Sequence, residues 1–331
     1  MSVLLTDKLA QIREDRHDLP VLQNMLRFII RRLLITIPTI LVVITITWGL
    51  IRLAPGNFYI SEKAIPPAIE KNIRLKYGLD KPWYDQYGHT IWNIVRHFDF
   101  GTSLKYEGQS VNSIIARSLP VSATVGILAY LLALIVGIIA GSIAALKPNS
   151  KRDYASMALA MLGISIPNFV LGPILILIFS LTLYWFPPSR WNGFPSRNVV
   201  LPVLTLSGLY MAYIARLTRA GMLEVLRSDY IRTARAKGLS EMQVVIRHAL
   251  RGGLMPVVSY TGPALAFLVT GTVVVERIFV LPGLGSYFIQ ASLNRDEPLI
   301  LGIVAFVAIT LLMMNLLVDV AYAYLDPRIR Y

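Results

Sequence analysis

Uninterrupted runs of apolar residues, each long enough to cross a lipid bilayer, constrain this chain more than any other feature. They lie in a sequence of 331 residues that is 55% hydrophobic and only 15% charged. A bilayer-spanning helix needs roughly 20 consecutive apolar residues, and a helix satisfies its own backbone N–H and C=O groups where lipid cannot. The pattern therefore predicts an all-α membrane protein with six transmembrane helices. These runs cover residues 28–53, 119–146, 154–186, 199–219, 257–280 and 298–325.

Basic residues are distributed unevenly between the short connections. Three lie in 147–153 and eight in 216–255, whereas the short connections on the other side hold two each. Since short loops rich in Lys and Arg stay in the cytoplasm, both termini are predicted to be cytoplasmic. An even number of spans agrees with this orientation.

The long segment 54–118 is predicted to be external and to form a small helical cap, with a helix around 68–77. It holds eight basic and six acidic residues and several turn-forming sequences. The predicted organisation is an N-terminal cytoplasmic extension (1–27), the first transmembrane helix (28–53), the cap (54–118), a five-helix core (119–325) with a cytoplasmic loop (216–255), and a cytoplasmic tail (326–331).

Composition and missing motifs exclude several classes of function. The net charge of +13 comes from residues that flank membrane spans, so nucleic acid is not an expected partner. Without cysteine the chain has no disulfide, thiolate metal site or Cys nucleophile. The first apolar run is too long for a signal peptide. No G-x-x-x-x-G-K-[ST], G-x-S-x-G or H-E-x-x-H sequence occurs, and the four His do not cluster, so neither a cofactor nor an enzymatic activity is expected.

The basic loop 216–255 is predicted to contain two short helices. Ser228 can serve as the N-cap of the first, and Gly238 can end it because glycine tolerates positive φ. Ser240 and Gln243 have the spacing of a capping box for the second helix, which is expected to run to about Arg251. Such a pair of helices can lie on anionic lipid headgroups or form a docking surface for a soluble partner.

Residues 230–239, Tyr-Ile-Arg-Thr-Ala-Arg-Ala-Lys-Gly-Leu, resemble the cytoplasmic "EAA" loop of ABC-importer permeases in its peptide-transporter form. Arg232, Thr233 and Ala234 stand where the general pattern has Glu-Ala-Ala. Over roughly 25–331 the chain is similar to the B-type permease subunit of bacterial oligopeptide importers, whereas 1–24 precede the usual family start. Further similar segments are 28–33, 52–56, 76–79, 99–103, 248–250, 281–285, 291–296, 318–322 and 326–331.

This resemblance implies a type I ABC importer permease that forms half of a pathway for oligopeptides across the bacterial inner membrane. The implied partners are a related permease, two cytoplasmic ATPase subunits that hold ATP and Mg²⁺, and an external substrate-binding protein. The helix 229–237 would sit in a cleft of one ATPase subunit. The implied coupling residues are Tyr230, Arg232, Thr233, Ala234, Arg235 and Gly238. Import of dipeptides, glutathione or nickel chelates stays open, as does a gradient-driven transporter.

Polar residues inside the spans are candidates for gate or interhelix contacts, because charge is costly there. Glu276, beside Arg277, is expected either to form an ion pair at the external interface or to contact substrate. Asp319, four residues after Asn315, is expected to make interhelical hydrogen bonds. Arg52 is expected to extend to the outer interface.

Overall fold

The computed structural model describes residues 30–32, 34–53, 75, 78, 80–188 and 190–325, with side chains up to residue 320. The predicted N-terminal extension 1–27, the tail 326–331 and, except for residue 75, the helix expected around 68–77 lie outside these residues. Within the described part of the chain the regular elements are helices, apart from one isolated bridge between Thr102 and Ser110.

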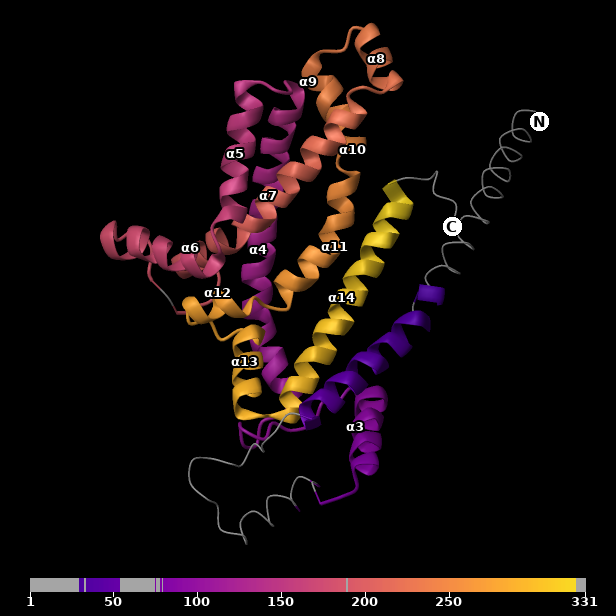
Figure 1. Ribbon diagram of the computed structural model, residues 1–331, viewed down its shortest axis with the longest axis vertical. Coiled ribbons are helices and arrows are strands. Elements are labelled where there is room, and N and C mark those ends of the chain that lie inside the picture. Colours follow the sequence, from indigo (N-terminus) through magenta and orange to yellow (C-terminus); the bar gives the residue numbers. More distant parts are fainter. Residues whose placement is uncertain are drawn as a thin grey trace, which may run out of the picture.

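The helices follow the chain from the first membrane-length helix to α14 (Figure 1). Their bounds are Ile30–Leu53, α3 Trp83–His97, α4 Val111–Leu146, α5 Lys151–Ser165, α6 Asn168–Leu175, a π-helix Ile176–Thr182, a 3-10 turn Arg197–Val199, α7 Val200–Val225, α8 Asp229–Ala236, α9 Glu241–Gln243, a π-helix Val244–Ala249, α10 Leu250–Gly253, α11 Met255–Val269, α12 Val273–Ile278, α13 Leu284–Asn294 and α14 Glu297–Leu325.

Five helical segments are long and apolar enough to cross a membrane, and a bent pair makes a sixth candidate. The bent pair is Lys151–Ser165 and Asn168–Thr182, whose axes differ by 100°. The predicted span 154–186 is therefore a broken one, with its two helical parts sharply bent relative to each other. Ile166 is extended, with φ −103° and ψ 113°, because a residue before proline avoids the helical region. The helix therefore stops before Pro167 and restarts as α6, which projects sideways (Figure 1).

Three other boundaries differ from the prediction. α4 begins at Val111 and not at 119, because the Oγ of Ser110 caps it by accepting from the N–H of Ser113 at 3.2 Å; the predicted cap 54–118 thus loses its last turns to α4. α7 continues past 219 to Val225. The fifth span is interrupted between α11 and α12, where Gly271 has φ +101°.

The core forms where α4 packs against α7. Gly137 and Gly141 lie one turn apart on α4, and a Cβ on Gly137 would be 2.8 Å from Cγ2 of Ile214, while one on Gly141 would be 2.7 Å from Cβ of Thr218. Small residues four positions apart allow membrane helices to approach closely. Leu268 of α11 and Phe279, directly after α12, are part of the same apolar core.

Candidate functional site

Residues 228–253, comprising α8, α9, the following π-helix and α10, form a ledge at one end of the bundle. In Figure 1 it stands beyond the ends of α5 and α7. Ile231 and Ala234 of α8 are buried against Val244 and Val245 of the second helix. The same apolar cluster includes Met222 of α7 and Ala145 of α4. The ledge is therefore packed onto the ends of the two core helices and is not a free loop.

Two of the three predicted caps are present in the ledge. The N–H of Gln243 donates to Ser240 Oγ (3.4 Å), and the N–H of Ser240 donates to Gln243 Oε1 (3.1 Å), which confirms the capping box. Gly238 has φ +79° and ends α8 as predicted. Ser228 is the N-cap residue of α8 as predicted, but the expected side-chain cap is not formed, since its Oγ donates to the carbonyl oxygen of Val225 at 2.7 Å and accepts no N–H from α8.

The predicted coupling residues divide into an outward and an inward group. Tyr230, Arg232 and Thr233 are exposed on the ledge. Arg232 makes only an exposed contact with Asp229 Oδ1, at 3.3 Å. Ala234 is 4% exposed, so the close packing expected of it is with this chain itself.

Arg235 is held across the turn at Gly238. Its Nε donates to Glu241 Oε1 at 2.8 Å and its Nη2 donates to Glu241 Oε2 at 3.2 Å. A two-pronged arginine–carboxylate pair fixes orientation as well as charge. Arg235 therefore braces α8 against the second helix.

Two exposed apolar residues of the ledge were missed in the sequence. Met242 and Ile246 are 68% and 58% exposed and lie four positions apart on the second helix. Residues four apart share a helix face, so this spacing next to a charged helix was an available signal. They add an apolar spot to a surface that otherwise looked basic.

A buried ion pair lies between the ledge and the bundle. Asp153, 2% exposed, accepts from Arg219 Nε (2.8 Å), Arg219 Nη2 (2.7 Å) and the N–H of Asn149 (2.9 Å). It joins the start of α5 to α7 two turns before α7 ends. Neither residue was singled out in the sequence, although Asp153 follows Ser150 at the spacing of a helix N-terminus.

Glu276 lies buried towards the opposite end, 3% exposed. Ser122 Oγ donates to its Oε1 at 2.7 Å, and the N–H of Ser286 donates to its Oε2 at 2.8 Å. The N–H of Leu284 donates to Ser122 Oγ at 2.9 Å. The carboxylate thus joins α4, α12 and α13. The ion pair expected with Arg277 is absent from these described residues, because the carboxylate is directed to internal donors.

The remaining candidates in the spans are contacts between helices. Asp319 Oδ2 of α14 lies 2.7 Å from Arg32 Nη2 of the first helix, so its predicted interhelical contact is formed as an ion pair. Asn315 lies against α11, since a Cβ on Gly262 would be 3.2 Å from its Oδ1.

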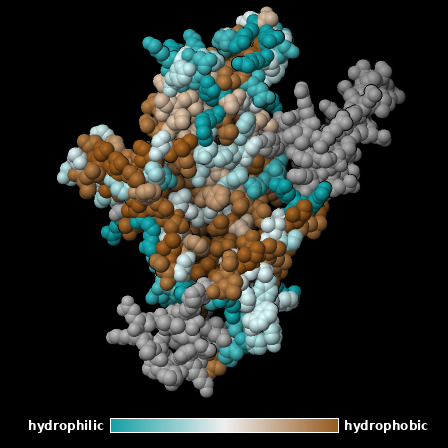
Figure 2. Space-filling view, in the orientation of Figure 1, coloured by the Kyte–Doolittle hydropathy of each residue, from teal (hydrophilic) through white to brown (hydrophobic). Residues whose placement is uncertain are grey.

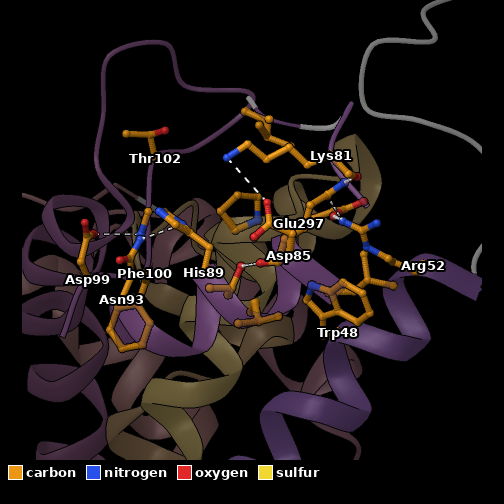
Figure 3. A pocket seen from close by; sticks show the side chains of 18 of the residues that line it. Trp48, Arg52, Lys81, Asp85, His89, Asn93, Asp99, Phe100, Thr102 and Glu297 are labelled. Carbon is orange, nitrogen blue, oxygen red and sulfur yellow. Dashed lines mark hydrogen bonds and ion pairs between the residues drawn. The ribbon is translucent and has the colours of Figure 1, made fainter. Parts of the chain in front are cut away.

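A cavity of about 500 Å³ lies between the first helix, α3 and the start of α14 (Figure 3). Arg52 sits over the ring of Trp48 at 4.4 Å and pairs with Glu297 at 3.8 Å, and Lys81 pairs with Asp85 at 3.7 Å. These charges satisfy one another, so the cavity offers little unpaired charge to a ligand. Across the described residues no group of His, Asp and Glu is arranged to hold a metal ion.

Comparison with known proteins gives consistent matches along the chain. The model of the family described as "binding-protein-dependent transport system inner membrane component" matches residues 137–331, and the model of its N-terminal part matches 25–126. The chain is 48% identical over 307 residues to the oligopeptide transport system permease protein OppB of Escherichia coli and 46% identical over 307 to that of Haemophilus influenzae, each covering 93% of this chain and 100% of the relative. It is 44% identical over 306 residues to the dipeptide transport system permease protein DppB of Bacillus subtilis, covering 92% and 98%.

Among solved structures, an inward-facing form of the MetNI methionine ABC transporter, from the CY5 SeMet soak crystal form, superimposes with a TM-score of 0.54. The identity is 16%, and the match covers 64% of this chain and 96% of that one. A likeness at this identity concerns the fold alone.

Proposed function

Because the chain belongs to the family of binding-protein-dependent transport system inner membrane components, we propose that it is the permease subunit of an ABC importer for oligopeptides. Similarity to OppB along nearly the whole chain carries this assignment. The chain is a multi-pass inner membrane protein and is not itself an enzyme, since permeases of this family work with separate ATPase subunits.

The proposed assembly contains this chain, a related permease, two cytoplasmic ATPase subunits that bind ATP and Mg²⁺, and an external substrate-binding protein. The two permeases would enclose the pathway between them. Both termini of this chain would be cytoplasmic, as the basic residues of 147–153 and of the ledge favour. We assign oligopeptides rather than dipeptides as the substrate because this chain is 46–48% identical to the OppB relatives and 44% identical to DppB.

The outer face of the ledge is the proposed contact with an ATPase subunit. Its exposed Tyr230 and Arg232 supply an aromatic ring and a solvent-accessible guanidinium, while Met242 and Ile246 supply apolar area. Aromatic, Met and Arg side chains are enriched at protein interfaces.

Motion of the ATPase subunits would reach the spans through the ledge. The buried cluster of Ile231, Ala234 and Met222 ties the ledge to α7. The pair between Asp153 and Arg219 ties α7 to α5. Because packed interiors resist deformation, closure of the ATPase pair would move these helices as one body and switch the pathway between the two faces of the membrane.

The test replaces Arg232 and Met242 separately with Glu and measures ATP-driven peptide uptake in vesicles that contain the complete complex. A reversed charge or a buried carboxylate at the interface is expected to lower both uptake and co-purification of the ATPase subunits about tenfold, equivalent to about 1.4 kcal/mol of binding. The matched control Arg152→Glu, at an exposed position outside the ledge, is expected to retain both.

Normal co-purification of both ledge variants would contradict the docking surface. Absence of ATP-dependent uptake of any peptide by the unmodified complex would contradict the transport function.

A further inference from the structure

The exposed faces of the membrane-length helices are not alike. On α4 the exposed large hydrophobic side chains include Ile127, Leu131, Ile135, Ile139 and Ile143, which are aliphatic and four residues apart. The first helix exposes a similar set that includes Leu34, Ile46 and Leu50. Such stripes suit hydrocarbon tails, which satisfy no polar group.

The face shared by α7 and α11 carries a different kind of side chain. Tyr213 is 38% exposed, Arg216 is exposed one turn further along α7, and Tyr210 and Tyr260 are half-buried beside them. We call these four residues the tyrosine–arginine patch. In the space-filling view, pale and teal atoms interrupt the brown surface over α7 and α11 (Figure 2).

The patch is stacked and ordered. The rings of Tyr213 and Tyr260 lie 5.7 Å apart at 29°, and those of Tyr210 and Tyr260 lie 6.3 Å apart at 40°. Cζ of Arg216 lies 4.8 Å from the centre of the Tyr213 ring. Tyr130 of α4 lies behind them and donates to Thr261 Oγ1 at 2.6 Å. The aromatic rings therefore form a platform that spans two helices.

Arg216 lies within the membrane-length helix α7, in the part where the predicted span 199–219 and the basic segment 216–255 overlap. α7 continues to Val225, and Arg219 is anchored to Asp153 one turn after Arg216. From Tyr210 to Arg216 the patch extends about 9 Å along the helix, at about 1.5 Å a residue.

Arg216 rests on the Tyr213 ring but forms no ion pair with a carboxylate among the described residues. The ion pairs formed among the described residues involve Arg32, Arg52, Lys81, Arg219, Arg232 and Arg235, and not Arg216. An arginine within a membrane span faces protein or a water-filled cavity rather than hydrocarbon. This face of α7 and α11 is therefore suited to an aqueous pathway that carries anionic or zwitterionic cargo.

We propose that the tyrosine–arginine patch is a peptide-contact surface of the translocation pathway, with Arg216 pairing with the peptide's carboxylate. The proposal rests on the peptide-import function and assigns substrate contacts to it. Peptides differ in their side chains but share a C-terminal carboxylate, for which a guanidinium is a two-pronged donor. Tyrosine rings accept many side chains by stacking, and their hydroxyls can bond peptide amides. A phosphate of a lipid headgroup has the same anionic chemistry and is the competing occupant.

The deciding experiment places a photo-crosslinking amino acid at position 213 or at 260 in the complete complex in vesicles, with the external binding protein, ATP and radiolabelled trialanine. Label is expected at both positions, and only while ATP is supplied. The same amino acid at position 135, on the aliphatic face of α4, is the matched control and is expected to stay unlabelled. Equal labelling at 213, 260 and 135, or none at 213 and 260 in complexes that import trialanine, overturns the proposal.

The variant Arg216→Gln separates the carboxylate from lipid phosphate. Uptake of trialanine is expected to fall about tenfold relative to uptake of its C-terminal amide, which corresponds to the loss of one charge-assisted pair. An equal fall for both peptides, or a fall that disappears in vesicles without anionic lipid, assigns Arg216 to headgroups and overturns the proposal. If the unmodified complex imports neither peptide, the proposed function itself fails, whatever the crosslinking shows.

Discussion

At the scale of single residues, Glu276 shows how a carboxylate is accommodated inside an apolar bundle. Removing such a group from water is costly unless hydrogen bonds replace the lost hydration. Ser122 and the N–H of Ser286 provide them. A Cβ on Gly283 would be 2.5 Å from Glu276 Oε1, and one on Gly285 would be 3.1 Å from Oε2. Gly283, just before α13, and Gly285, in its first turn, are therefore needed to make space for the carboxylate.

Replacing Glu276 with alanine should destabilise the protein, because Ser122 Oγ and the N–H of Ser286 would be left buried without an acceptor. An unsatisfied buried donor costs about 1–3 kcal/mol. Thermal unfolding in detergent should therefore show a lower midpoint for Glu276→Ala. The control Glu224→Ala removes an exposed carboxylate and is expected to unfold like the unmodified chain. Equal midpoints for the two variants would show that the hydrogen bonds at Glu276 contribute little.

At the scale of elements, the close approach of α4 to α7 organises the bundle. The glycine pair of α4 removes the side chains that would separate the two backbones. The close approach increases the contact area and with it the van der Waals packing, which is the main attraction between helices in lipid. The ledge benefits from the same arrangement, because its apolar cluster rests on the ends of these two helices.

A pair of glycine-to-alanine substitutions tests this packing, and the two are expected to change stability in opposite directions. Alanine is favoured over glycine in a helix by about 1 kcal/mol, so Gly88→Ala of α3, where nothing lies within 4 Å of the new Cβ, should be neutral or stabilising. Gly141→Ala gains the same propensity but places its Cβ 2.7 Å from Cβ of Thr218, so it should be destabilising. Unfolding midpoints in detergent measure both, and a stabilising Gly141→Ala would contradict the close packing.

At the scale of the whole molecule, charge and shape together predict which end meets the cytoplasm. The ledge and the basic turn 147–153 lie at one end, and α3 and α13 lie at the other (Figure 1). This arrangement agrees with a ledge on the cytoplasmic side of the membrane, where the ledge could contact soluble ATPase subunits.

The absence of native cysteine makes the orientation directly measurable. Asp85→Cys on α3 and Lys151→Cys at the start of α5 are both exposed positions. In spheroplasts with an intact inner membrane, a membrane-impermeant maleimide should label Asp85→Cys without permeabilisation and Lys151→Cys only after permeabilisation. The unmodified chain provides the background. Labelling in the reverse order would show that the ledge faces outwards.

Local rules predicted the local features of the site and missed the features that depend on tertiary packing. The capping box at Ser240 and the end of α8 at Gly238 depend on a few consecutive residues, so both could be read from the sequence. Ser228 has the right residue type for a cap, but its hydroxyl donates a hydrogen bond to the carbonyl oxygen of Val225 instead. Ala234 looked like a contact for a partner because small size allows close approach, and size alone does not say which surface approaches.

By itself the sequence determined the environment and the class of this protein. Apolar runs of membrane length require helices, basic turns predict an orientation, and family motifs along the chain identify an importer permease. Each apolar run, basic turn or motif can be recognised from the residues of a single helix or turn.

Only the tertiary structure decided what each side chain faces. The contact between Ser122 and Glu276 joins residues 154 positions apart, and the patch of Tyr213, Arg216 and Tyr260 exists because α7 and α11 lie side by side. Whether a polar side chain meets its own chain, lipid or a passing peptide depends on how helices cross. The crossing geometry of two helices depends on the packing of many side chains from several segments, so it cannot be read from any one segment.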